Sequence, residues 1–544
     1  MSKTVIFGYP GTGKTTYLIN ILDKYLKEGI KPESICFCSY TKSAAEEIKD
    51  RASKKFNLKK EEMVYFGTIH SLCYKRFALN KEVIKQNHIS TFFKLKSLEY
   101  DEFESNDEIL VMESFGEQVG NKLINFYNLL RITECKNIYD IKDVEELKLI
   151  YAKSKMPDDY FTTIFSNVFN PHKILMDYEE YKNKGNLIDF TDMLLMALKS
   201  QWIVPTEILI VDEAQDLSPI QWALFDLWKQ NKKEIYIAGD DDQSIYAFNG
   251  ADPKRLIKEK ETADKVEILS TTWRLSKVIH DYCLTYINSH IDSKNRIIKE
   301  VISLKEGGEI VEEYIDNDLQ RVREFIRIGK STFILFRTNN YKRQFVSEVL
   351  IPNGILYWEI RGQSIWNNKT MNLYNAIIKL SNNKSLNAIE LQYLIESISS
   401  SFKLLKRGLK TNFKDMDKKV SYNLEDLLTL GFDMKIFDYL KDMKILNVLK
   451  ITDNLKAAFL NKPNEEIVFP LNLYVGTAHS SKGKECDDVI LFKDITKRIA
   501  KEITKDKQSW EDEIRVFHTA QTRAKERLVI LRGGFDYSES DLIP

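Results

Sequence analysis

Residues 4–15 read TVIFGYPGTGKT, and this stretch decides the fold of the first part of the chain. Its apolar start, Val5 to Phe7, is typical of a short buried strand, and the glycines that follow predict a tight turn. Residues 14–27 have the pattern of a helix, which we expect to end near Gly29. A strand, a glycine-rich turn and a helix in this order indicate an α/β domain with a parallel sheet.

The turn GYPGTGKT fits the phosphate-binding pattern G-x-x-x-x-G-K-[ST]. Glycines let successive backbone N–H groups face phosphate oxygens, and the start of the next helix adds its positive dipole. The Lys14 ammonium group can reach the β- and γ-phosphates, and the Thr15 hydroxyl can bind Mg²⁺. We therefore expect a nucleotide site made of Gly8, Tyr9, Pro10, Gly11, Thr12, Gly13, Lys14, Thr15 and Thr16.

A second apolar run, Ile208 to Val211, ends in the acidic pair Asp212 and Glu213. Asp212 is expected to hold Mg²⁺ through its water shell, and Glu213 is placed to activate the attacking water. Taken alone, the pair fits a solvent-facing strand end equally well. Phosphoryl transfer also needs positive charge near the γ-phosphate, for which Arg274 and Arg523 are candidates. For a single arginine, a surface salt bridge is the alternative.

The composition indicates a globular protein of several domains. The chain has 544 residues, which at about 150 residues per domain suggests three or four domains. Its 80 basic and 80 acidic residues balance, which argues against a protein that binds nucleic acid through overall basicity but not against a local basic groove. Six irregularly spaced cysteines favour reduced thiols over a zinc site. No leader sequence and no apolar run near ~18 residues occurs, so we expect a cytoplasmic protein without a membrane segment.

The pattern along the chain predicts two α/β domains, each interrupted by a mostly helical insertion. Strand-like runs recur at 34–40, 208–211 and 235–238, and again at 332–336, 473–475, 489–492 and 528–531. Two stretches between them read as helical. The expected boundaries are 1–80 and 185–266 for the first domain, 81–184 for its insertion, 267–376 and 465–544 for the second domain, and 377–464 for the second insertion.

Further motifs follow the phosphate-binding turn in a fixed order. They are SYTKSAA at 39–45, GTIHSL at 67–72, LIDFTD at 187–192, VDEAQD at 211–216, GDDDQSIYAFNGA at 239–251, TWRLS at 272–276, TAHSSKGKECDDVIL at 477–491 and QTRA at 521–524. This series resembles the superfamily-one DNA helicases of the UvrD, Rep and PcrA type, whose motifs include TFTNKAA, GTFHSL and GDDDQSIYRWRGA. The resemblance implies two RecA-like P-loop motor domains that use ATP and Mg²⁺.

The resemblance also implies roles for single residues. Gln243 would sense the γ-phosphate, Arg274 and Arg523 would act as arginine fingers, and Glu485 would contact the nucleotide's sugar or phosphate. The implied DNA contacts are Tyr40, Thr41, Thr68, His70, Ser71, Tyr246, Phe248 and His479. An aromatic face can stack on any base without reading sequence. Core packing is the alternative for the three rings, and a structural role is the alternative for His70.

Several positions depart from the family pattern. Seven residues precede Gly8, so we do not expect the family's upstream glutamine, which recognises adenine, and the preference for ATP over other nucleotides stays open. Phe248 and Asn249 replace the tryptophan and the second arginine of RWRGA. His518 stands where the family usually has tyrosine.

The implied function is an ATP-dependent DNA helicase that moves 3′-to-5′ on single-stranded DNA and acts at single/double-strand junctions. One alternative is a translocase that displaces bound proteins with little unwinding, and another is a 5′-to-3′ helicase. A nucleotide-gated binding protein with a decayed motor is less consistent with the intact Lys14, Asp212, Glu213, Gln243, Arg274 and Arg523. The resemblance suggests a role in DNA repair or replication, while the pathway, protein partners and oligomeric state stay open.

Overall fold

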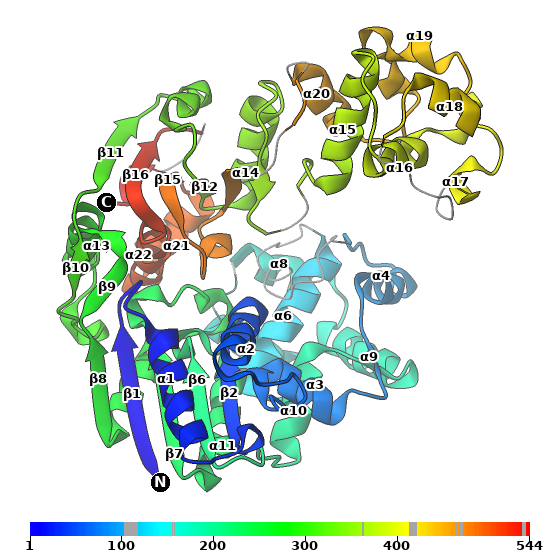
Figure 1. Ribbon diagram of the computed structural model, residues 1–544. Helices are drawn as coiled ribbons and strands as arrows, with labels where there is room; N and C mark the ends of the chain where they lie inside the picture. Colours follow the sequence, from blue (N-terminus) through cyan, green and yellow to red (C-terminus); the bar gives the residue numbers. More distant parts are fainter. Residues whose placement is uncertain are drawn as a thin grey trace. The chain divides into compact units, whose positions relative to one another are not determined.

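The computed structural model describes residues 1–102, 118–154, 156, 158–361, 364–412, 421–462, 465–467, 472–535 and 540–544. The chain divides into two compact units (Figure 1). The first unit consists of Met1–Glu309 and Lys501–Glu526, and the second consists of Ile310–Ala500 and Arg527–Pro544. The chain therefore leaves the first unit and returns to it late in the sequence.

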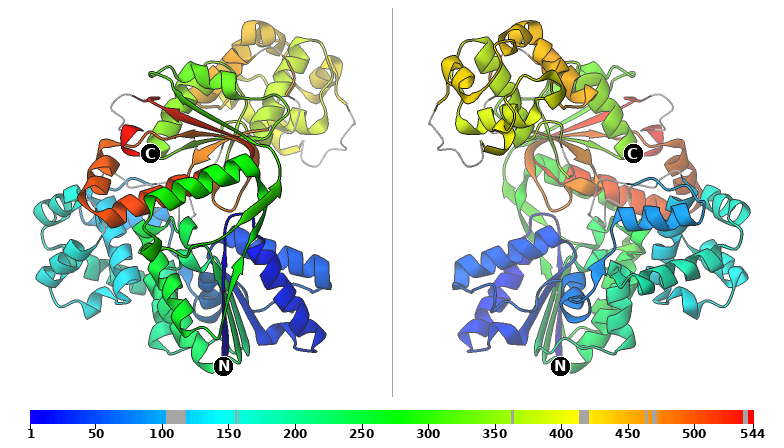
Figure 2. Two further views of the ribbon diagram at one scale, coloured as in Figure 1. Left: turned by 90° about the vertical axis from the view of Figure 1, so that its left-hand side faces the viewer. Right: turned by 90° about the vertical axis from the view of Figure 1, so that its right-hand side faces the viewer.

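A six-stranded sheet forms the centre of the first unit. Its strands lie in the order β3-β2-β6-β7-β1-β8, and every neighbouring pair is parallel. Both views of Figure 2 show β1, which starts at the chain's N-terminus, beside β8. The strand bounds are β1 Ser2–Gly8, β2 Ile35–Ser39, β3 Phe66–Thr68, β6 Ile208–Asp212, β7 Glu234–Gly239 and β8 Lys265–Leu269.

Parallel pairing brings three motifs to one edge of this sheet. In the register of β1 and β7, Phe7 lies opposite Gly239, and in that of β2 and β6, Ser39 lies opposite Asp212. Because parallel strands all end on the same side, the phosphate-binding turn, the acidic pair and the GDDDQ segment follow strand ends that lie together. The helices that connect these strands are α1 Lys14–Lys27, α2 Lys42–Phe56, α3 Ile69–Phe77, α10 Phe190–Lys199, α11 Pro219–Trp228 and α12 Pro253–Glu259.

The helical insertion in the first unit has a core of its own and is tied to α10 by buried ion pairs. Arg131 lies 2.7 Å from Asp189 and 2.6 Å from Asp192, and Lys182 lies 2.7 Å from Asp189. Asp189 also caps the start of α10. The elements here are β4 Glu82–Val83, α4 Gln86–Leu95, α6 Val119–Glu134, α7 Val144–Lys153, α8 Asp158–Asn167, α9 Pro171–Lys184 and β5 Leu187–Ile188.

Four further elements complete the first unit. They are β9 Thr271–Ser276, α13 Lys277–His290, β10 Ile302–Lys305 and α22 Lys507–Gln521. The strands β9 and β10 pair with each other in a separate two-stranded sheet. The last helix, α22, is more than 200 residues from β10 in sequence, yet it packs in this unit.

The second unit contains another six-stranded sheet, in the order β11-β16-β15-β12-β14-β13. Within it, β12 is parallel to both β14 and β15. Its strands are β11 Glu309–Tyr314, β12 Thr332–Phe336, β13 Trp358–Glu359, β14 Leu473–Thr477, β15 Cys486–Phe492 and β16 Ala524–Arg532. Its helices are α14 Asn339–Phe345, α15 Asn368–Ser381, α16 Ala388–Ser397, α17 Leu409–Asn412, α18 Leu424–Leu430, α19 Ile436–Leu440 and α20 Asp453–Asn461, and α21 Lys497–Lys505 spans the division between the units.

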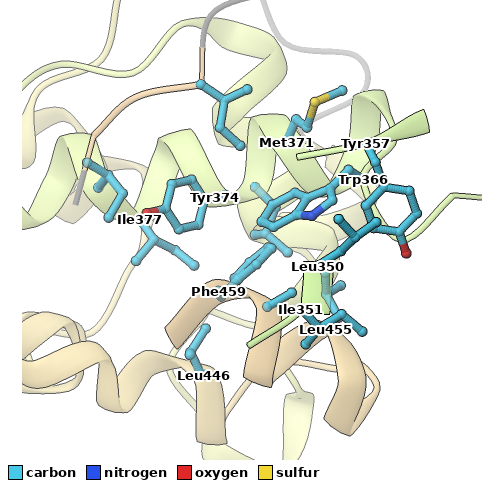
Figure 3. Close-up of a cluster of buried hydrophobic side chains, with 14 of the residues drawn as sticks. Leu350, Ile351, Tyr357, Trp366, Met371, Tyr374, Ile377, Leu446, Leu455 and Phe459 are labelled. Atoms are coloured by element: carbon cyan, nitrogen blue, oxygen red, sulfur yellow. The ribbon is translucent and has the colours of Figure 1, made fainter. Parts of the chain in front are cut away.

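Aromatic packing forms the core of the helical part of the second unit (Figure 3). The rings of Trp366 and Phe459 stack with centroids 5.5 Å apart, and Tyr374 meets Phe459 edge to face at 5.1 Å. These contacts join α15 to α20 through side chains that are fully or almost fully buried. The helical segment thus shares one continuous hydrophobic core with its sheet.

The structure confirms the expected α/β fold class, with two RecA-like parallel sheets. The domain boundaries stay a prediction, and the boundary at 464 lies outside the described residues. All six cysteines are free thiols. Among the described residues, no helix combines the length and apolar character needed to cross a membrane.

Candidate nucleotide-binding site

The backbone of the phosphate-binding turn requires glycine at three positions. Gly11 and Gly13 have φ angles of 77° and 82°, in the left-handed region that other residues avoid. A Cβ atom on Gly8 would lie 2.5 Å from Oγ1 of Thr12 and 2.7 Å from Cγ of Lys14. The sequence therefore permits a loop so tightly folded that the Lys14 side chain passes directly over its first residue.

Positive groups gather in this loop. The Lys14 ammonium group donates a hydrogen bond of 2.7 Å to the Gly8 carbonyl oxygen and is almost buried. Helix α1 begins at Lys14, and no side chain caps its first N–H groups. A buried ammonium group beside an uncapped helix start is the arrangement that binds phosphate oxygens.

The acidic pair lies next to this loop. Oγ1 of Thr15 donates to a carboxylate oxygen of Asp212 at 2.7 Å. Burial, together with the neighbouring Glu213 carboxylate, raises the pKa of Asp212 to about 6. A hydroxyl and a carboxylate in contact offer the hard oxygen ligands that Mg²⁺ prefers, so the residues predicted to hold this metal fit it.

Glu213 has a left-handed backbone, with φ of 55°. Its side chain accepts a hydrogen bond of 2.6 Å from Nε2 of Gln215. The carboxylate predicted to activate water is therefore held by a buried amide of the same VDEAQD motif.

Gln243 and Arg523 meet, although they are 280 residues apart. The side chain of Gln243 donates from Nε2 to Asp240 at 2.7 Å and accepts at Oε1 from Arg523 at 2.5 Å. Arg523 also donates to the Thr519 carbonyl oxygen at 2.8 Å. The predicted γ-phosphate sensor and one predicted arginine finger thus form one buried cluster in the first unit.

The strand that carries Arg274 lies against the phosphate-binding turn. A Cβ atom on Gly11 would come within 2.4 Å of Cβ of Arg274, and Oγ1 of Thr272 donates to the Pro10 carbonyl oxygen at 2.8 Å. The N–H group of Trp273 donates to the Gly11 carbonyl oxygen at 3.0 Å. Trp273 was not predicted as a site residue, and the residue is 70% exposed. The sequence signal that could have identified it is its position directly before the candidate Arg274.

A second unpredicted contact links Tyr9 to α22. The Tyr9 hydroxyl lies 3.0 Å from Nε2 of His518, and the ring of His280 packs edge-on to Tyr9 with centroids 5.6 Å apart. All three side chains are buried. Burial lowers the pKa of His518 to about 4, so its imidazole is neutral at pH 7.

The predicted DNA contacts of the first unit occupy two groups of positions. The rings of Tyr40 and Tyr246 pack with centroids 5.0 Å apart, and Phe248 lies edge-on to Tyr246 at 5.8 Å. Tyr246 is fully buried, and Asn249 donates to the Tyr40 hydroxyl at 3.3 Å. Their contact with DNA stays a prediction.

The polar members of that set lie at helix starts. Thr41 caps α2, and Thr68 caps α3 by accepting from the Ser71 N–H group at 3.1 Å. His70 lies on α3 with its ring perpendicular to Phe190. In the second unit, His479 is buried at the end of β14, and Glu485 is exposed just before β15. The roles of all these residues stay predictions.

Comparison with known proteins shows that the chain is similar to DNA helicases. Residues 1–264 match the UvrD/REP helicase N-terminal domain. The chain is 25% identical to a probable DNA helicase II homologue of Mycoplasma genitalium, over 97% of this chain and 82% of that protein. It is 23% identical to the putative ATP-dependent DNA helicase YjcD of Bacillus subtilis, over 96% of this chain and 75% of that protein.

A further relative is the ATP-dependent DNA helicase Rep of Buchnera aphidicola. It is 23% identical over 65% of this chain. The matched region covers 54% of Rep, so the chain spans little more than half the length of that relative.

Proposed function

We propose that the chain belongs to the UvrD-like helicases, to which it is similar, and that it hydrolyses ATP to move along single-stranded DNA and separate duplexes. The observation that carries the proposal is the convergence of Lys14, Thr15, Asp212 and the Gln243–Arg523 pair on the strand ends of one parallel sheet. These groups are the ones that phosphoryl transfer requires.

In the proposed reaction, the phosphates of ATP bind in the glycine turn. The Lys14 ammonium group exchanges the Gly8 carbonyl oxygen for phosphate oxygens, and the N–H groups at the start of α1 bind others. Thr15 and Asp212 would hold Mg²⁺, which neutralises phosphate charge when bound. Glu213 orients the attacking water and takes its proton.

Gln243 connects this chemistry to the DNA-binding prediction. Its side chain is held between Asp240 and Arg523, and Tyr246 follows it by three residues in the same segment. A shift of Gln243 toward the γ-phosphate therefore pulls on the backbone that leads to Tyr246 and Phe248. We propose that, through this segment, binding and hydrolysis of the nucleotide change how tightly the single strand is held.

We propose that the chain moves 3′-to-5′ along the strand, because its QSIY and SSKG segments resemble those of the helicases that move in this direction. Movement 5′-to-3′ is the alternative. The test is unwinding of duplexes carrying either a 3′ or a 5′ single-stranded tail, with ATP and with other nucleotides. We expect ATP-dependent separation of the 3′-tailed duplex only, and its loss in Lys14→Ala. Unwinding of the 5′-tailed duplex alone would reverse the proposed polarity.

A parallel assay separates unwinding from protein displacement. Streptavidin bound to a biotinylated strand is released by a translocase that does not need to open a duplex. Release without strand separation would replace the helicase proposal with a displacement motor. Failure of single-stranded DNA to stimulate ATP hydrolysis would contradict both.

A further inference from the structure

Lys299 lies inside a cluster of three buried carboxylates from the GDDDQ motif. Its ammonium nitrogen is 3.0 Å from Asp240, 2.7 Å from Asp241 and 2.9 Å from Asp242. All four side chains have no solvent exposure. Arg296 adds a second cation, since its Nε donates to Asp242 at 2.8 Å.

The three carboxylates are close enough together to hold a metal ion, because their oxygens lie within 4.8 Å of one another. The Lys299 ammonium group lies against all three and supplies the positive charge that such a cluster requires. Three carboxylates buried together repel one another strongly and remain ionised only when a cation is supplied. The chain therefore carries its own cation at this position.

A series of direct contacts leads from Lys299 to the proposed catalytic groups. Asp240 contacts Lys299 through one carboxylate oxygen and accepts from Gln243 through the other. Gln243 in turn accepts from Arg523. All of these residues lie in the first unit.

The donors in this series fix the direction of each hydrogen bond. A guanidinium group only donates, so the Gln243 carbonyl oxygen must face Arg523 and its amide nitrogen must face Asp240. An ionised Asp240 offers only acceptors, so one oxygen can face Lys299 and the other Gln243, whereas a protonated carboxyl group would carry an O–H donor and accept more weakly. Burial opposes ionisation, but the charge of Lys299 holds the pKa of Asp240 below its usual value.

We propose that Lys299 is a positioning residue for ATP hydrolysis, whose buried ammonium group holds Asp240 as a carboxylate with both oxygens accepting and so fixes Gln243 and Arg523. The inference rests on the proposed function, because it assumes that these two side chains act on the nucleotide. Without the cation, Asp240 takes up a proton or turns away, and the Gln243 amide loses its orientation.

The chain offers a matched control in a second buried lysine pair. Lys3 lies 2.7 Å from Glu259, with side chains 4% and 3% exposed, at the opposite end of β1 from the phosphate-binding turn. Lys3→Met removes a buried cation in the same unit without touching the GDDDQ motif. Both variants should lower the melting temperature, because both remove a buried cation from a buried carboxylate, although Glu259 keeps its contact with Arg255.

The test compares the full chain with Lys299→Met and Lys3→Met in single-stranded-DNA-stimulated ATP hydrolysis and in thermal melting. We expect Lys299→Met to lower kcat about 100-fold with KM for ATP changed less than about threefold, the size of effect that misplaced catalytic groups produce. Lys3→Met should keep kcat within about twofold although it also lowers the melting temperature. Equal losses of kcat in both variants, or full kcat in Lys299→Met, would overturn the proposal.

Two further measurements keep the proposal testable if Lys299→Met is poorly folded. Lys299→Ala purified in ethylammonium chloride should lose kcat about tenfold on desalting and regain it when the amine returns, with sodium chloride as the control. A folded, amine-free Lys299→Ala with wild-type kcat would contradict the inference. In a Gln243→Ala background, Lys299→Met should lower kcat less than about threefold, since both changes act through one residue. If the double variant instead lost kcat by the product of the two single-variant losses, Lys299 would not act through Gln243.

These outcomes separate the inference from the proposed function. An active wild-type protein with an unaffected Lys299→Met would overturn the inference alone. A wild-type protein without DNA-stimulated ATP hydrolysis would overturn the proposed function and the inference with it.

Discussion

A single hydrogen bond joins the phosphate-binding turn to the helix that precedes Arg523. The Tyr9 hydroxyl reaches His518, five residues before Arg523. We expect Tyr9→Phe to lower kcat for ATP hydrolysis about tenfold, because loss of a buried hydrogen bond of about 1 kcal/mol loosens the placement of the arginine. Steady-state kinetics with single-stranded DNA measures the effect.

The control for this change is Tyr25→Phe. Tyr25 also makes one phenol hydrogen bond, of 2.8 Å to the Tyr236 hydroxyl, in the core of the same unit. The Tyr25→Phe variant should lose a similar amount of stability and keep its kcat. If both variants lose kcat equally, Tyr9 contributes only to folding.

Gly11 is the residue at which the turn and β9 approach most closely. Gly11→Ala would place Cβ 2.4 Å from Arg274 and force a left-handed alanine. We expect loss of nucleotide binding, measured with a fluorescent ATP analogue, because β9 must move away from the turn. Gly29→Ala is the matched control, since Gly29 has φ of 83° but open space around it. That variant should lose about 1 kcal/mol of stability and bind nucleotide normally. Equal binding by both variants would show that the close approach is not needed.

At the scale of elements, a buried glutamate among the insertion helices makes stability depend on pH. Burial raises the pKa of Glu179 on α9 to about 7, against 4.5 for an ordinary glutamate. The folded chain therefore binds this proton more tightly than the unfolded chain. Since that preference is lost as pH rises toward and past 7, the free energy of unfolding should fall between about pH 5 and pH 8.

Melting curves across this pH range test the expectation. Glu179→Gln should flatten the dependence, because the amide does not titrate. Glu180→Gln is the control on the same helix, where the side chain is exposed and paired with Lys184. A wild-type slope in Glu179→Gln would assign the pH dependence to other groups.

The elements that local pattern decides were predictable from the sequence. The helix expected at residues 14–27 and the strand expected at 332–336 have those bounds, because glycines and apolar runs mark their ends. The phosphate-binding turn and the acidic pair were predictable for the same reason. Their chemistry is contained in short contiguous stretches.

Contacts made by distant pairing were not predictable. Lys299 lies 57 residues from Asp242 and belongs to no motif, so its place among three carboxylates depends on how α13 returns the chain to the first sheet. The bond between Tyr9 and His518 spans 509 residues. Nor could the sequence show that Tyr40 and Tyr246 pack against each other, since periodicity cannot distinguish a ring that faces a ligand from a ring that faces another ring.

At the scale of the whole molecule, the structure shows where part of the balanced charge lies. The buried clusters around Lys299 and around Arg131 each combine cations and carboxylates with little or no exposure. Some of the charged residues that make up the zero net charge are therefore buried and cannot contact a ligand. The proposed attraction to DNA phosphates must therefore come from the lysines and arginines that remain on the surface.

The return of the chain to its first unit has a consequence during synthesis. The first unit requires Lys501–Glu526, so a ribosome must make about 190 residues of the second unit before α22 emerges. At about 5–20 residues per second this interval lasts roughly 10–40 s. Throughout it, the nascent chain carries a phosphate-binding turn without His518 and a Gln243 without Arg523. A polypeptide released early thus lacks the groups that complete the site, and the proposed motor cannot assemble before α22 has been made.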